Sequence, residues 1–179
     1  PLGGILGLFG PSGCGKSTFL RMLLGQEVPS RGKILCNGEA LREEPDEKRG
    51  IVFQRYSVFP HLTVLQNVVL GAEFAASRFI GKLWGSRKRA VEEEARRLLT
   101  AVGLQASEKK HPHELSGGMQ QRLAMAQSLI KKPQILLLDE PFGALDPGIR
   151  ADMHELVLSL WRETGTTVFM VTHDLREGF

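Results

Sequence analysis

Residues 10–18 read Gly-Pro-Ser-Gly-Cys-Gly-Lys-Ser-Thr, and their types and spacing suit the binding of a phosphate chain. Glycines at 10, 13 and 15 let backbone N–H groups curve around an anion, and a helix that follows directs its positive end at the same anion. Lys16 supplies a charge for the terminal phosphates, and the Ser17 hydroxyl is a hard oxygen ligand for Mg²⁺. The predicted ATP-binding residues are Gly10, Pro11, Ser12, Gly13, Cys14, Gly15, Lys16, Ser17 and Thr18.

A second reactive group follows the aliphatic run Ile135–Leu138, where the chain reads Asp139-Glu140-Pro141. Asp139 can hold Mg²⁺ through water, and Glu140 can polarise an attacking water molecule. Together with the glycine loop, this acidic pair predicts hydrolysis of a nucleoside triphosphate.

The elements that must position these groups alternate between strands and helices. Strands are predicted at Ile5–Phe9, Lys33–Cys36, Gly50–Phe53, Ile135–Leu138 and Thr166–Val171. Helices are predicted at Phe19–Leu24, Thr63–Gly71, Arg87–Val102, from Gly118 to about Lys131, and Pro147–Glu163. We expect Arg42–Arg49 to be a solvated connection. The alternation indicates an α/β fold with a mostly parallel sheet, in which ligands bind at the carboxyl ends of the strands.

Composition narrows the class of protein. The net charge of +3 is small, and basic residues are scattered among acids, so a nucleic-acid partner is not indicated. Two cysteines, no signal segment and no apolar run of about 20 residues favour a reduced, cytoplasmic setting for a chain that does not itself span a membrane.

A second anion-binding segment lies at 115–122, which reads Leu-Ser-Gly-Gly-Met-Gln-Gln-Arg. Ser116 can cap the following helix, and Gly117 and Gly118 leave backbone amides open to a second phosphate. This segment resembles the signature motif of ABC-type ATPases, and the blocks that match the family span essentially the whole chain. The resemblance implies a P-loop NTPase fold with an inserted α-helical lobe that carries the signature.

The resemblance also implies how the chain is divided and which residues act. It implies one ABC ATPase domain over 1–179, with a RecA-like core at about 1–57 and 133–179 and a helical subdomain at about 58–132. Catalytic roles fall on Glu140, His173 and Gln54, and the Mg²⁺ ligands are Ser17, Gln54 and Asp139. In a head-to-tail dimer, the residues that contact the partner's ATP are Ser116, Gly117, Gly118, Gln120 and Asp146.

The resemblance further implies a transport motor. ATP and Mg²⁺ are its cofactors, and its partners are a second ATPase subunit, identical or paralogous, transmembrane permease subunits and a substrate-binding protein. Its place is peripheral, on the cytoplasmic face of the inner membrane. The amino-acid sequence as a whole resembles those of the ATPase subunits of bacterial importers of nitrate, sulfonate and taurine. Coupling is expected through Arg55–Leu62.

Two alternatives remain. One is an ABC-type ATPase that acts on ribosomes or in repair and has no membrane partner, although residues 19–115 leave no room for the long insertion of repair members. The other is a module that binds ATP without hydrolysing it. It is disfavoured by the presence of all five expected residues, which are Lys16, Gln54, Asp139, Glu140 and His173. Since the family's first strands, its adenine-stacking aromatic and its last strands find no counterpart, the domain is expected to be truncated at both ends.

Overall fold

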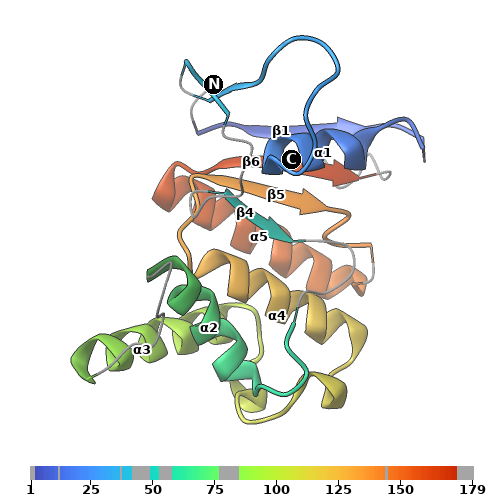
Figure 1. The fold of residues 1–179 in the computed structure, drawn as a ribbon. Coiled ribbons are helices and arrows are strands. Elements are labelled where there is room, and N and C mark those ends of the chain that lie inside the picture. Colours follow the sequence, from blue (N-terminus) through green and yellow to red (C-terminus); the bar gives the residue numbers. More distant parts are fainter. Residues whose placement is uncertain are drawn as a thin grey trace.

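The protein is described by a computed structural model over residues 3–11, 13–36, 38–41, 49–52, 58–76, 85–143 and 145–172. Four strands form one sheet in the order β1-β6-β5-β4 (Figure 1). Their bounds are β1 Ile5–Phe9, β4 Arg49–Val52, β5 Ile135–Asp139 and β6 Thr167–Thr172, and every pair is parallel. The predicted parallel α/β sheet is confirmed.

Successive side chains of the two central strands pack on opposite faces of the sheet. Leu136 and Leu138 of β5 join the larger apolar core, whereas Leu137 between them joins a smaller one. Both faces are thus covered by helices, which explains why Ile135–Leu138 and Val168–Val171 are continuously apolar instead of alternating with polar residues.

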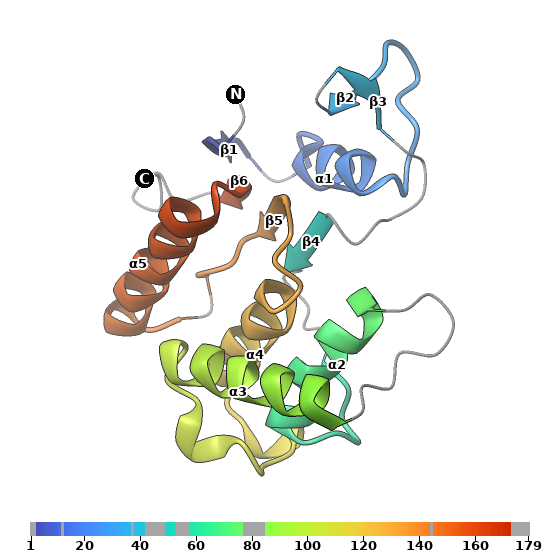
Figure 2. The ribbon, with the colours of Figure 1, turned by 90° about the vertical axis from the view of Figure 1, so that its left-hand side faces the viewer.

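Helix α1 (Lys16–Leu24) covers one face of the sheet through Leu20, Leu23 and Leu24. Helix α5 (Pro147–Thr164) and helix α4 (Gly117–Leu129) pack on the other face. Figure 2 shows α1 apart from α4 and α5, with the edges of β4, β5 and β6 between them.

The helical lobe consists of α2 (Val64–Ala76), α3 (Gly85–Ala101) and α4, joined by short 3-10 turns at Gln105–Ser107 and Pro112–Glu114. Its apolar residues are continuous with the core beneath the sheet. As predicted, α3 buries one stripe, including Ala95, Leu98 and Leu99, and exposes a charged face with a Lys88–Glu92 ion pair at 3.9 Å.

Two local predictions are wrong. The strand expected at Lys33–Cys36 is only β2 (Leu35–Cys36), paired antiparallel with β3 (Glu39–Ala40) in a separate hairpin. Arg49, expected in a solvated connection, is a buried residue of β4 whose guanidinium donates to the Leu23 carbonyl oxygen at 3.1 Å. Arginine usually lies at the surface, but a carbonyl at the end of α1 provides Arg49 with a buried acceptor.

Among the described residues, no helix is long and apolar enough to cross a membrane.

Candidate nucleotide-binding site

The glycine loop connects β1 to α1, as the sequence predicts. Gly13 and Gly15 have φ angles of 82° and 100°, in the left-handed region that side chains other than glycine rarely adopt. A Cβ atom on Gly10 would lie 2.8 Å from the sulfur of the exposed Cys14 side chain. The turn that the loop makes therefore depends on the glycines at 13 and 15.

Lys16 curls back over the loop that precedes it. Its ammonium donates to the carbonyl oxygens of Gly10 at 2.7 Å and Pro11 at 2.8 Å, and lies 3.9 Å from the Cys14 sulfur. The charge of Lys16 is thereby held over the concave side of the glycine loop, where a phosphate chain would have to lie.

The first turn of α1 differs from that of α4. No side chain among the described residues caps the start of α1, whereas the Ser116 hydroxyl accepts a hydrogen bond from the Met119 N–H at 3.3 Å at the start of α4. The first N–H groups of a helix need an acceptor from outside the helix. At α1 an anion can fill this need, and the helix dipole favours one.

The acidic pair lies at the end of β5. β6 separates β5 from β1, so the acids are two strands away from the glycine loop, or about 10 Å at the usual strand spacing. Asp139 is the last residue of β5 and is half-buried. Since all these strands are parallel, the loop and the acids meet at one edge of the sheet, as predicted.

Burial and the negative charge of Glu140 raise the pKa of Asp139, while the charges of Lys16 and Arg21 act in the opposite direction. The positive charges of Lys16 and Arg21, both on α1, therefore act on the Asp139 carboxylate. Carboxylates such as these, and a serine hydroxyl such as that of Ser17, are hard oxygen ligands of the kind that Mg²⁺ prefers. No cluster of three or more His, Cys, Asp or Glu exists in the described part of the chain.

Glu140 has a backbone conformation that glutamate rarely adopts. Its φ angle is 47°, its N–H donates to the Val171 carbonyl at 2.9 Å, and its own carbonyl accepts from Gly143 N–H at 3.4 Å and from the Gln121 side chain at 3.3 Å. The left-handed turn directs the chain away from the strand immediately after Asp139. No sequence signal indicated it.

The signature segment begins α4 and is exposed at Ser116 and Gly117. Gln120, predicted to contact a partner's nucleotide, uses its amide within its own subunit: it donates to the carbonyls of Pro112 at 2.9 Å and Leu115 at 3.3 Å. These bonds fix the chain just before the helix and hold the exposed glycines in place.

The remaining predicted residues are divided between exposed and undescribed positions. Asp146 is exposed and stands just before α5, without a side-chain capping bond there. Ser12, Gln54 and His173 lie outside the described residues, as do residues 55–57 of the predicted coupling segment.

The sequence did not point to two of the residues that shape the site and its surroundings. Arg21 lies one turn beyond Ser17 on α1, a spacing that could have suggested its proximity to the acids. Asn67, on α2, is completely buried and binds the backbone of the segment before it: it accepts from Phe59 N–H at 2.7 Å and donates to three carbonyl oxygens, those of Phe59, Leu62 and Thr63, at 3.0–3.1 Å.

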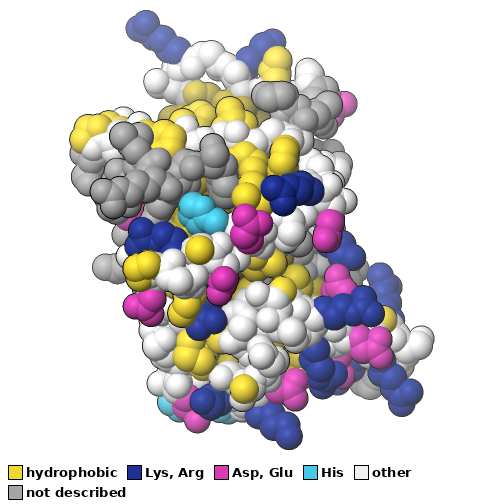
Figure 3. Space-filling model, turned by 180° about the vertical axis from the view of Figure 1, so that it is seen from behind, with side chains coloured by type: hydrophobic (Ala, Val, Ile, Leu, Met, Phe, Trp, Pro, Cys, Tyr) yellow, Lys and Arg dark blue, Asp and Glu magenta, His cyan; other side chains and the backbone are white. Residues whose placement is uncertain are grey.

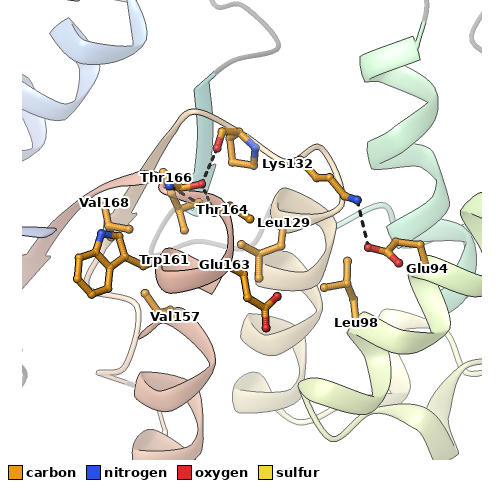
Figure 4. A pocket seen from close by; sticks show the side chains of 12 residues that line it. Glu94, Leu98, Leu129, Lys132, Val157, Trp161, Glu163, Thr164, Thr166 and Val168 are labelled. Atoms are coloured by element: carbon orange, nitrogen blue, oxygen red, sulfur yellow. Dashed lines mark hydrogen bonds and ion pairs between the residues drawn. The ribbon is translucent and has the colours of Figure 1, made fainter. Parts of the chain in front are cut away.

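A separate hollow of about 140 Å³ lies at the opposite end of the sheet (Figure 4). It is lined by residues at the amino ends of β5 and β6, such as Leu136 and Val168, and by Trp161 of α5, and a Lys132–Glu94 ion pair at 3.5 Å spans its side toward α3. Because parallel sheets bind ligands at the carboxyl ends of strands, this hollow is distinct from the nucleotide site.

The surface on the rear of the molecule mixes both signs of charge. Figure 3 shows Lys and Arg side chains interspersed with Asp and Glu over the lobe, with no extended patch of one sign.

Comparisons with known proteins agree with this geometry. Residues 1–143 match the protein family described as ABC transporter. The chain is 44% identical over 177 residues to the spermidine/putrescine import ATP-binding protein PotA of Nitrosomonas europaea, covering 98% of this chain and 46% of that protein. It is 41% identical to the taurine import ATP-binding protein TauB of Roseobacter denitrificans, covering 98% of this chain and 62% of that one. The chain thus spans about half of the length of these relatives.

Solved structures give the same result. The dimeric post-hydrolysis state of the ATP-binding cassette MJ0796, bound to ADP and Pi, superimposes with a TM-score of 0.84 at 33% identity, covering 99% of this chain and 78% of that chain. The predicted P-loop fold with its inserted helical lobe is confirmed by this likeness, and relatives longer than this chain are consistent with the predicted truncation. The chain belongs to the ABC transporter family.

Proposed function

We propose that the chain is the ATP-hydrolysing subunit of an ABC importer and binds MgATP at a head-to-tail interface with a second such subunit. The observation that carries this proposal is the placement of two phosphate-binding segments. The glycine loop leads into α1 on one face of the sheet, and the signature starts α4 on the other.

Segments on opposite faces are badly placed to hold one phosphate within a single subunit. In a two-fold dimer, each signature can lie against the partner's glycine loop, and both sites are completed at once. The likeness to a dimeric ATP-binding cassette bound to ADP and Pi supports this arrangement. The exposure of Ser116, Gly117 and Asp146 supports it too, because residues that serve a partner must be accessible.

Within each site, the loop Gly10–Thr18 would bind the phosphates, with Lys16 turning from its carbonyl partners to the phosphate oxygens. Ser17 and Asp139, together with Gln54, would hold Mg²⁺, which neutralises charge on the phosphates. Glu140 would orient the attacking water, with His173 beside the terminal phosphate. Positioning and electrostatics of this kind account for most of the catalysis of phosphoryl transfer.

The partner would contribute Ser116, Gly117 and Gly118 through their hydroxyl and backbone amides. Gln120 would act by fixing the loop in front of these residues, since its amide is bonded to Pro112 and Leu115.

Transport is the proposed use of the ATPase cycle, with permease subunits in the membrane and a substrate-binding protein delivering solute. The subunit would then lie on the cytoplasmic face of the membrane. Phe59, which lies within the expected coupling segment and whose backbone is hydrogen-bonded by Asn67, is a suitable contact for the permease. Relatives named for polyamine and for taurine import are similarly close, at 44% and 41% identity, so the solute group is left open.

The dimer is tested with Glu140→Gln, which keeps the side-chain volume and removes the carboxylate. We expect this variant to form a stable dimer with saturating MgATP in analytical ultracentrifugation, because ATP is bound and not hydrolysed. Glu155→Gln, on the exposed face of α5, should behave like the unmodified protein. A Glu140→Gln variant that binds MgATP and stays monomeric would contradict the head-to-tail site.

The transport role is tested by co-purification of the subunit with a permease. We expect Phe59→Ala to reduce the amount of permease that co-purifies.

A further inference from the structure

One buried side chain connects the signature helix to the acidic pair. Gln121 is only 2% exposed, and its Nε2 atom donates to the carbonyl oxygen of Glu140 at 3.3 Å. From the sheet side, the N–H of Glu140 is held by Val171 at 2.9 Å. The left-handed backbone of Glu140 is therefore fixed from two elements, α4 and β6.

Stability alone does not account for this glutamine. Its Oε1 atom is buried and has no hydrogen-bond partner among the described residues. A buried acceptor without a partner costs free energy, so an apolar side chain of equal size would serve folding at least as well. Unsatisfied buried groups of this kind call for a functional explanation.

The position of Gln121 on α4 suggests that explanation. The helix begins at the Ser116 cap and is braced there by Gln120, so its first two turns form one rigid unit. The same unit carries the residues proposed to touch the partner's nucleotide at one end and the hydrogen bond to Glu140 at its second turn.

We propose that Gln121 is a positioning residue that orients the Glu140 carboxylate of its own subunit through the backbone carbonyl. Resting on the proposed function, this assignment means that a signature helix seated on the partner's ATP also fixes the catalytic carboxylate of the subunit that carries it. The two sites of the dimer are thereby linked through one hydrogen bond on each side.

The test uses Gln121→Met, which keeps the length of the side chain without its amide. The control is Gln127→Met on the same helix, a buried glutamine that makes no hydrogen bond to Asp139 or Glu140 in the described part of the chain. We expect Gln121→Met to lower kcat of ATP hydrolysis roughly threefold to tenfold, the effect of one hydrogen bond of about 0.7–1.4 kcal/mol. KM for ATP and the urea midpoint should be unchanged, and Gln127→Met should match the unmodified protein in kcat.

A mixed dimer identifies which site is affected. One subunit carries Glu140→Gln, so a single turnover reports only the site whose Glu140 lies in the other subunit. Gln121→Met should slow this turnover when it is placed with the intact Glu140, and not when it is placed in the subunit that supplies the signature.

The assignment would be overturned if Gln121→Met slowed the turnover only when placed in the subunit that supplies the signature, or if kcat of the homodimer were unchanged. Either result would leave the proposed ATPase function intact. A protein without ATPase activity before any change would instead refute the proposed function.

Discussion

The left-handed backbone of Glu140 can be detected by its effect on stability. At a φ of 47°, a residue with a Cβ atom is strained by about 1–2 kcal/mol, whereas glycine is not. Glycine also gives the unfolded chain more freedom, which costs about 0.4–1 kcal/mol relative to alanine. The difference favours glycine by about 0.5–1 kcal/mol.

The comparison is therefore Glu140→Gly against Glu140→Ala. Both variants remove the carboxylate with all its interactions, so their difference isolates the backbone. At Glu155, in the exposed middle of α5, the same pair should give the opposite sign, with alanine more stable by about 1 kcal/mol.

Urea denaturation with a common m-value measures all four free energies of unfolding. The reasoning predicts that glycine is the more stable choice at position 140 and the less stable at 155. If alanine were favoured at both positions by the same amount, Glu140 would not be in the left-handed region, and the strain argument would be refuted.

Two other predictions concern polar groups away from the acidic pair. Asn67→Ala removes four hydrogen bonds to the backbone of Phe59–Thr63 and should lower the free energy of unfolding by about 2–4 kcal/mol in urea, while a loss below about 0.5 kcal/mol would show that the clamp contributes little. Burial lowers the pKa of Lys131 below its usual 10.5, so the folded state binds fewer protons than the unfolded state between the two values, and stability rises with pH through that window. Lys131→Met should consequently be more stable than the unmodified protein at pH 7, by an amount that shrinks toward pH 10.5; a pH-independent difference in urea titrations would contradict this.

Much of the site could be predicted because its signals are local. A glycine loop between an apolar strand and a helix is confined to residues 5–24, and the turn itself requires the glycines at 13 and 15. The signature, with a serine cap before α4, is equally local. The aliphatic run Ile135–Leu138, followed by two acids, also identified β5. A strand that is covered on both faces is apolar at successive positions, so the run itself is a local signal.

Contacts between distant segments could not be predicted in this way. Arg49 looks like a surface residue until β4 places it beside the end of α1, and Asn67 looks like an ordinary helix position until the preceding segment folds over it. In both cases the partner is a backbone carbonyl, which carries no sequence signal.

The sequence by itself determined the chemistry of this protein: the loop at Gly10–Thr18, the acids Asp139 and Glu140, and the signature that places the chain in its family. Only the tertiary structure decided how these parts are connected. Parallel pairing of β1, β6 and β5 brings the loop and acids to one edge, and packing of α1 and α4 on opposite faces separates the glycine loop from the signature. Gln121 and the strained turn at Glu140 follow from that packing, because hydrogen bonds between α4 and the sheet depend on side-chain placement and not on sequence spacing.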